Sequence, residues 1–162
     1  MTDASTQAAA AATGTELKAT LSIAASPAQV WALVSDLKRM GEWSPQVVRT
    51  LVIPEPVRAG SRMFNLNRQG WKFWPTRAKV VRFEPHRDIA FRINENHTVW
   101  SFQLEELEGG TLLTHRRETP EGITRVSNAL VSLILGGQER FVPRLLEGMS
   151  QTLERIKAEL ER

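Results

Sequence analysis

The chain contains no cysteine, and this absence removes several kinds of chemistry at once. Disulfide bonds, thiolate nucleophiles and cysteine-ligated metal sites are all excluded. The three histidines, His86, His97 and His115, form neither a His-x-His nor an HExxH motif, and the acidic residues show no metal-ligand spacing. We therefore expect neither a metal ion nor another cofactor.

Long hydrophobic runs are also missing. The longest, residues 129–135, contains a serine and is far shorter than the roughly 20 residues that cross a bilayer. Residues 1–15 contain an acid, no basic segment and an alanine run too weakly apolar for a signal sequence, so they are predicted to be a disordered tail. A length of 162 residues fits one domain, which we place at residues 16–162, with a cytoplasmic location expected.

Positive charge is concentrated in one stretch, although the net charge is only +3. Residues 58–92, the basic band, hold nine Lys or Arg against two acids, whereas residues 93–162 hold eight against eleven. Such a band can attract nucleic acid or an anionic surface, but the simpler interpretation is the solvated face of several strands. No recognition helix, zinc-ligand spacing or RNA-binding aromatic signature is present, so a nucleic-acid partner is not expected.

One segment of the basic band is also rich in aromatic residues. Residues 68–77, RQGWKFWPTR, combine three aromatic rings with three cations. This composition is compatible with an exposed patch that contacts a membrane surface or a partner protein. Packing within the fold is the alternative explanation for each ring.

The start of the domain predicts a strand followed by two helical pieces. Residues 16–24 alternate apolar and polar side chains with the period of a half-buried strand. Ser26 and Pro27 then suit the cap and first turn of a helix, and Gln29 can complete a capping box. This helix should end near Leu37 and a shorter one should occupy residues 38–43.

The middle of the chain alternates with a period of two and is broken by short turns. The breaks predict strands near 46–53, 60–68, 71–83, 88–94, 97–107 and 111–118. With the first strand this makes seven, and the short connections favour antiparallel neighbours. Pro75 lies within one predicted strand, which indicates a bulge or an edge position there.

A long amphipathic helix is predicted over residues 139–160. Its apolar residues share one face: Val142, Leu146, Met149, Leu153, Ile156 and Leu160. Residues 122–138 show a weaker helical spacing with two glycines at positions 136 and 137, so they fit either a helical flap or a loop. The predicted fold class is α+β.

Three sequence strings in this order resemble the START-like (SRPBCC) superfamily of helix-grip proteins, which includes the polyketide cyclase/dehydrase and lipid-transport proteins. They are SPAQVWALVSDLKRMGEWSP at 26–45, VVRFEPHRDIAFR at 80–92 and WSFQLEELEGGTLLTHRRE at 100–118. The resemblance implies a seven-stranded curved antiparallel sheet wrapped around the long C-terminal helix. It also implies an elongated cavity between them that takes apolar ligands such as lipids or polyketides. The superfamily shares no single set of catalytic residues.

Alternation along the strands suggests which side chains line such a cavity. On the last strand, His115 and Arg117 should face inward together with Leu113 and supply polar groups at one end. The full set of candidate ligand-binding residues is Trp43, Phe64, Leu66, Trp74, Phe91, Trp100, Phe102, Leu113, His115, Arg117, Phe141, Leu145 and Met149.

Three functions remain open from the sequence. The first is binding of a hydrophobic small molecule in the cavity. The second is a polyketide cyclase or dehydratase activity, in which His115 acts as general acid or base and Arg117 holds a carboxylate or enolate. The third is a protein or RNA interaction module that uses the basic band.

Overall fold

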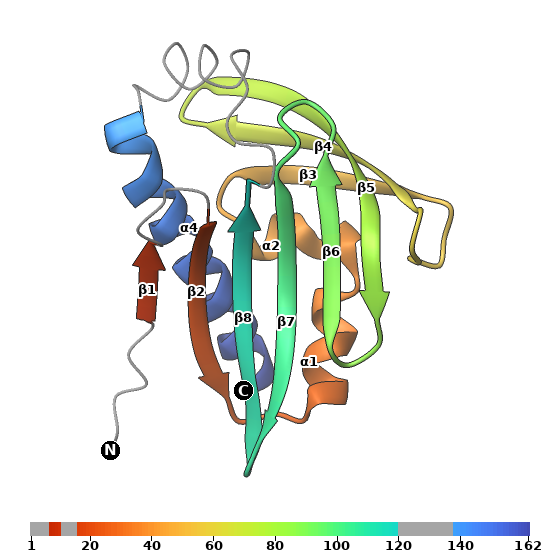
Figure 1. The fold of residues 1–162 in the computed structure, drawn as a ribbon, viewed down its shortest axis with the longest axis vertical. Coiled ribbons are helices and arrows are strands. Elements are labelled where there is room, and N and C mark those ends of the chain that lie inside the picture. The colour runs from red at the N-terminus through yellow and green to blue at the C-terminus, as the bar shows by residue number, and fades with distance from the viewer. Residues whose placement is uncertain (1–6, 11–15, 120–137) are drawn as a thin grey trace.

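An antiparallel sheet of eight strands curves around a long C-terminal helix (Figure 1). The structure is a computed structural model that describes residues 7–10, 16–119 and 138–162. The strands are β1 (Gln7–Ala10), β2 (Glu16–Ile23), β3 (Val47–Ile53), β4 (Arg62–Gln69), β5 (Lys72–Glu84), β6 (Asp88–Ile93), β7 (Val99–Leu107) and β8 (Gly110–Glu118). Their order in the sheet is β1-β2-β8-β7-β6-β5-β4-β3.

The helices all cover one face of this sheet, which we call the inner face (Figure 1). They are α1 (Pro27–Val34), the 3-10 turn η1 (Leu37–Arg39), α2 (Met40–Trp43) and α4 (Gln138–Leu160). None of the helices within the described ranges combines the length and hydropathy needed for a transmembrane span.

The seven predicted strands are confirmed as β2 to β8, and the α+β helix-grip fold is confirmed with them. The structure adds β1, which pairs with the outer edge of β2 within the predicted disordered tail. The rest of that tail lies outside the described residues, as does the possible flap at 122–137.

Two local predictions are also confirmed. Ser26 accepts a hydrogen bond from the backbone N–H of Gln29, whose side chain accepts one from the N–H of Ser26, so α1 begins with a capping box. Pro75 occupies an edge position, because β5 pairs with β6 only from Ala78 onward and has β4 as its single neighbour at Pro75. A proline is tolerated there because no strand pairs with the open side of β5, so no partner strand needs a backbone N–H from this residue.

The two halves of α4 are buried to different degrees. In the C-terminal half, Leu153 and Ile156 are fully buried against the sheet and α1, within the core cluster. In the N-terminal half, Val142 and Leu146 are only partly buried, although Leu145 between them is buried. The solid core therefore lies at the C-terminal half of α4, and the less closed part of the grip lies toward its N-terminal half.

The turn between β7 and β8 leaves no room for a side chain at Gly110. A β-carbon there would overlap the backbone carbonyl oxygen of Ile23 at the end of β2. We expect Gly110→Ala to lower the free energy of unfolding by about 2 kcal/mol, because the backbone of β2 must shift. Gly109→Asn is the control: Gly109 has a φ of +77° with open space around it, and asparagine accepts that conformation at small cost. Urea denaturation measures the free energy of unfolding of both variants. Equal decreases in the two would mean that Gly110 does not lie close to Ile23.

Candidate functional site

Strand β8 presents a gradient of side chains to the inner face, from apolar to polar. Leu113, His115 and Arg117 are all buried and alternate with partly exposed neighbours. In the sheet, His115 lies opposite Phe102 of β7, and Arg117 lies opposite Trp100. The predicted inward orientation of these three β8 residues is therefore what the structure has.

His115 is held as a neutral ring. Its Nδ1 lies 3.0 Å from the carbonyl oxygen of Ser101, and because that oxygen can only accept, Nδ1 carries the proton and Nε2 the lone pair. The ring stacks on Phe102 with centroids 4.2 Å apart and planes within 5°. Burial lowers the pKa of His115 to about 4, although the bond to Ser101 opposes the shift. At neutral pH the ring therefore adds polar atoms to the site without charge.

Arg117 adds a cation to the inner face, two residues after His115 on β8. Its side chain is buried, and its guanidinium carbon lies 5.8 Å from the centroid of the Trp100 ring, in the range of a cation–π contact. Burial lowers the pKa of Arg117 to about 10, so the group stays protonated at neutral pH. The inner face thus combines an aromatic wall, a neutral imidazole and a positive charge.

A polar network occupies the inner face of the β3–β5 half of the sheet. Thr50 donates to Asn65 over 2.9 Å, and Thr76 bonds to Asn65 at 3.4 Å and to Asn67 at 2.9 Å. These side chains come from three adjacent strands in register. Sequence reasoning missed all four, although the spacing of Asn65 and Asn67 placed them on one face of their strand.

Phe64 and Leu66 do not line the inner face, so this prediction is wrong. Both lie on the outer face of β4 with exposed fractions of 42% and 40%. The alternation along β4 does separate two faces, but the prediction placed the wrong face inside, since Met63 and Asn65 face inward. The register explains the choice: Met63 lies opposite Ala78, which is buried in the core.

Trp43 is a core residue instead of part of the cavity mouth. It is 2% exposed between α2 and α4, and its indole N–H donates to a carboxylate oxygen of Glu159 at 3.3 Å. Arg39 lies 5.2 Å above the same ring and also bonds to Glu159. These contacts tie α2 to the C-terminal end of α4 and give the tryptophan a structural role.

The structure brings most of the other candidates to the inner side of the fold. They are Trp74, Phe91, Trp100, Phe102, Leu113, His115, Arg117, Leu145 and Met149. The side chain of Phe141 lies outside the described residues. Among the described residues, no group of His, Asp and Glu side chains is arranged to hold a metal ion.

A surface groove of about 420 Å3 opens beside the less closed half of α4. One wall is the β4–β5 hairpin at Arg68 and Gly70, another is Pro45 before β3, and the third is α4 at Glu147 and Gly148. Gly148 has no side chain to fill the groove, and a β-carbon at this position would only reach van der Waals contact with Pro45, at 3.5 Å. The groove lies where the hairpin tip meets the helix.

Comparison with protein families gives a match over nearly the whole chain. A family model described as "Polyketide cyclase / dehydrase and lipid transport" matches residues 14–161. No curated protein sequence matches the chain significantly.

Solved structures share the fold at low sequence identity. Protein Ms6760 from Mycobacterium smegmatis is 17% identical with a TM-score of 0.66, over 96% of this chain and 97% of that one. The Polyketide_cyc-like protein Cgl2372 from Corynebacterium glutamicum is 27% identical with a TM-score of 0.60, over 90% and 91% of the two chains. The di-domain ARO/CYC StfQ from the steffimycin biosynthetic pathway is 18% identical with a TM-score of 0.70, over 91% of this chain and 50% of that one. This chain therefore corresponds to about half of the StfQ chain.

Proposed function

The chain belongs to the polyketide cyclase/dehydrase and lipid transport family, and from that premise we propose that it binds a hydrophobic small molecule with an acidic head. The apolar body lies along the inner face of the sheet, and the head reaches Arg117. The observation that carries the proposal is the gradient on β8, where a buried guanidinium follows a neutral imidazole and an apolar wall.

The apolar body is accommodated by aromatic side chains from three neighbouring strands. Phe91 lies opposite Trp100 in the sheet, and Trp74 lies half-buried on the same face of β5. Large rings give a broad apolar surface at low entropic cost, which suits ligands of varied shape.

The acidic head is suggested by the charge of Arg117. A planar guanidinium can donate two parallel hydrogen bonds to a carboxylate or an enolate. His115, with its proton on Nδ1, offers a lone pair on Nε2 and so suits a hydroxyl or another donor of the ligand. An anion at Arg117 also offsets part of the cost of burying a cation.

The groove between the β4–β5 hairpin and α4 is the proposed opening. It lies at the half of α4 where Val142 and Leu146 are incompletely buried. The polar network around Asn65 and Asn67 lies on the inner face of the same hairpin strands. A ligand entering there meets polar groups first and the aromatic wall after them.

Paired probes test the assignment of the head. We expect the protein to bind a fluorescent long-chain fatty acid more tightly than the matching fatty alcohol. The Arg117→Gln substitution should lower the affinity for the fatty acid by about 10- to 100-fold. This range corresponds to the loss of a hydrogen bond to a charged group. The affinity for the fatty alcohol should change little. Fluorescence titration of both probes gives the comparison.

Arg116→Gln is the matched control, because Arg116 is the next residue on β8 but faces outward. It pairs with Glu16 at 2.6 Å and Glu118 at 3.0 Å on the surface, where such pairs contribute little to stability. Equal loss of acid binding in both variants would refute the role of Arg117. If neither probe bound and native mass spectrometry found no ligand on the purified protein, ligand binding itself would be refuted.

A cyclase or dehydratase activity is the second candidate, favoured by the inward orientation of both His115 and Arg117. With a pKa near 4, His115 is a weak base at neutral pH, whereas acid–base catalysis works best with a pKa close to the working pH. Its expected contribution is orientation of the substrate. Incubation with a poly-β-ketone substrate should give the same products for wild type and His115→Asn if the protein only binds.

A further inference from the structure

The outer face of the sheet carries a cluster of exposed apolar side chains on β3, β4, β5 and the β4–β5 turn. We call it the outer patch, and its residues are Leu51, Ile53, Phe64, Leu66, Trp71 and Phe73. Their exposed fractions run from 40% for Leu66 to 82% for Trp71. Leu51 and Phe64 lie directly opposite each other on neighbouring strands, so these two side chains adjoin. A gathering of this kind marks an interaction surface more often than chance exposure.

A row of three cations crosses the same face. Arg62 of β4 lies opposite Lys79 of β5, which lies opposite Arg92 of β6. Like charges directly opposite each other destabilise a sheet. Within the described ranges, neither Arg62 nor Lys79 forms an ion pair. An anionic partner would remove this repulsion.

The other half of the outer face is arranged differently. On β8, Arg116 lies between Glu16 and Glu118 and pairs with both. The charge of Arg116 is therefore balanced within the chain. In the half that bears the outer patch, Arg77 pairs with Glu95 at 3.1 Å and Arg82 pairs with Asp88 at 2.7 Å, whereas Arg62 and Lys79 form no ion pair with any described residue.

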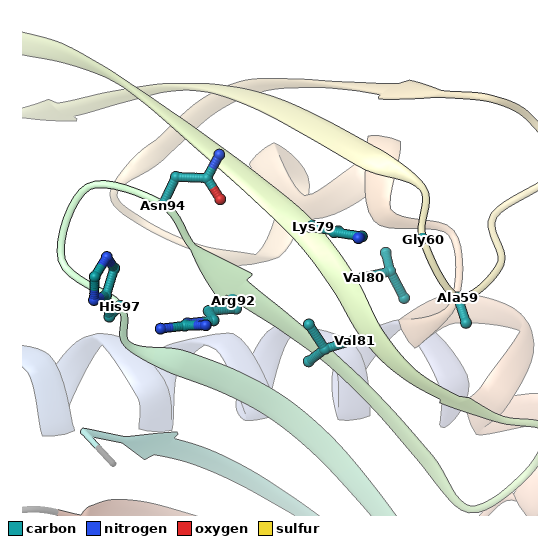
Figure 2. Close-up of a pocket in the computed structure, with 8 residues that line it drawn as sticks. All are labelled: Ala59, Gly60, Lys79, Val80, Val81, Arg92, Asn94 and His97. Atoms are coloured by element: carbon teal, nitrogen blue, oxygen red, sulfur yellow. The ribbon is translucent and has the colours of Figure 1, made fainter. Parts of the chain in front are cut away.

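A groove of about 600 Å3 is lined by two cations of this row, Lys79 and Arg92 (Figure 2). Lys79 and Arg92 approach it from neighbouring strands, and Asn94 and His97 border it from the β6–β7 turn (Figure 2). Val81 adds an apolar side chain, exposed at 41%. Ammonium and guanidinium groups around an open hollow suit the oxygens of a phosphate group.

We propose that this outer face docks on an anionic lipid membrane. Trp71, Phe73 and the aliphatic side chains enter the headgroup region, while the row of Arg62, Lys79 and Arg92 binds lipid phosphates, one of them in the groove. Indole rings favour this boundary, and each basic residue near an anionic surface adds to the attraction. The basic band is therefore a docking surface, on the side of the sheet opposite the ligand site.

The aliphatic residues distinguish a membrane from nucleic acid. Aromatic rings and arginines alone would also suit single-stranded RNA, where bases stack on rings. Leu51, Ile53 and Leu66 cannot stack on bases, and they offer no hydrogen bonds to phosphate or sugar. Their exposure beside the cations favours a partner that has both an apolar phase and negative charge.

Vesicle co-sedimentation of the full chain tests the proposal. We expect binding to vesicles of phosphatidylcholine mixed with phosphatidylserine, none to phosphatidylcholine alone, and weakening as salt rises. The double variant Arg62→Glu/Lys79→Glu should bind at least 10-fold more weakly, and Trp71→Ser several-fold more weakly. Both changes are at exposed positions, and circular dichroism checks that the variants fold.

Lys18→Glu is the matched charge control, because Lys18 is exposed on the outer face of β2, at the other end of the sheet from the outer patch. It should bind vesicles nearly as well as wild type, and so should Arg117→Gln, which alters the ligand site alone. Loss of binding in Arg117→Gln would mean that the protein extracts lipid through its cavity and would overturn docking. Absence of binding to the mixed vesicles, equal weakening by Lys18→Glu, or displacement from vesicles by RNA at low concentration would also overturn it.

Discussion

Replacing Leu153 with aspartate should unfold the protein at room temperature. Leu153 is fully buried in the C-terminal half of α4 and belongs to the main core cluster. The substitution removes an apolar side chain, which alone costs about 3 kcal/mol, and places a carboxylate where it has no water. The sum, about 5 kcal/mol or more, is comparable to the whole stability of a domain of this size.

A graded series separates the two contributions. Leu153→Ala should lower the free energy of unfolding by about 3 kcal/mol and leave a folded protein. Ala158→Asp, an exposed position on the same helix, should cost under about 1 kcal/mol, because its carboxylate remains hydrated. Urea denaturation followed by circular dichroism measures all three. If Leu153→Asp were no less stable than Leu153→Ala, water would have to reach Leu153, and the solid core assigned to this half of the grip would be wrong.

The strands were predictable because most of them follow a strict alternation between two environments. On β8, every second residue from Thr111 to Arg117 is buried, and Gly109 and Gly110 mark the turn at the start of the strand. The helix α1 was predictable for a local reason, since its capping box lies within four residues. Signals of this kind depend on neighbours in the chain and need no knowledge of the fold.

The faces of β4 were not predictable from alternation alone. The pattern divides Met63 and Asn65 from Phe64 and Leu66, but hydrophobicity chose the wrong pair as the inner one. Two asparagines are acceptable inside because β3 and β5 supply Thr50 and Thr76 as partners. That information lies in residues on other strands, which the pattern of β4 alone does not contain.

β1 and Trp43 illustrate two further limits. The alanine run of β1 has no alternation, and it forms a strand because the edge of β2 offers unpaired backbone groups. Trp43 lies two residues before Pro45, between a predicted helix and a predicted strand, a position that is also compatible with a cavity mouth. In the fold it is buried in the core, and its N–H donates to Glu159, more than a hundred residues away. Tertiary contacts of this range leave no local mark in the sequence.

Acidification should destabilise the protein through His115 before most carboxylates are protonated. In the unfolded chain a histidine has a pKa of about 6.5, whereas burial lowers the pKa of His115 in the folded protein to about 4. Above pH 6.5 the ring is neutral in both states and costs nothing. As the pH falls below 6.5, His115 becomes protonated in the unfolded chain but stays neutral in the folded protein. The free energy of unfolding therefore decreases until the pH reaches about 4, where the folded protein binds the proton too. The loss from this residue is about 2 kcal/mol at pH 5 and about 3 kcal/mol at pH 4.

The His115→Asn variant isolates this loss from the general effect of acid. Asparagine keeps an N–H donor for the carbonyl oxygen of Ser101 but cannot be protonated in this range. The wild type should be the more stable protein at pH 7.5, and its advantage should shrink by about 2 kcal/mol by pH 5. Urea denaturation of both proteins at each pH gives the difference, in which the shared carboxylates cancel. Parallel pH curves would mean that His115 accepts a proton in the folded state, and its ring would then have to lie near water or an acid instead of the apolar wall.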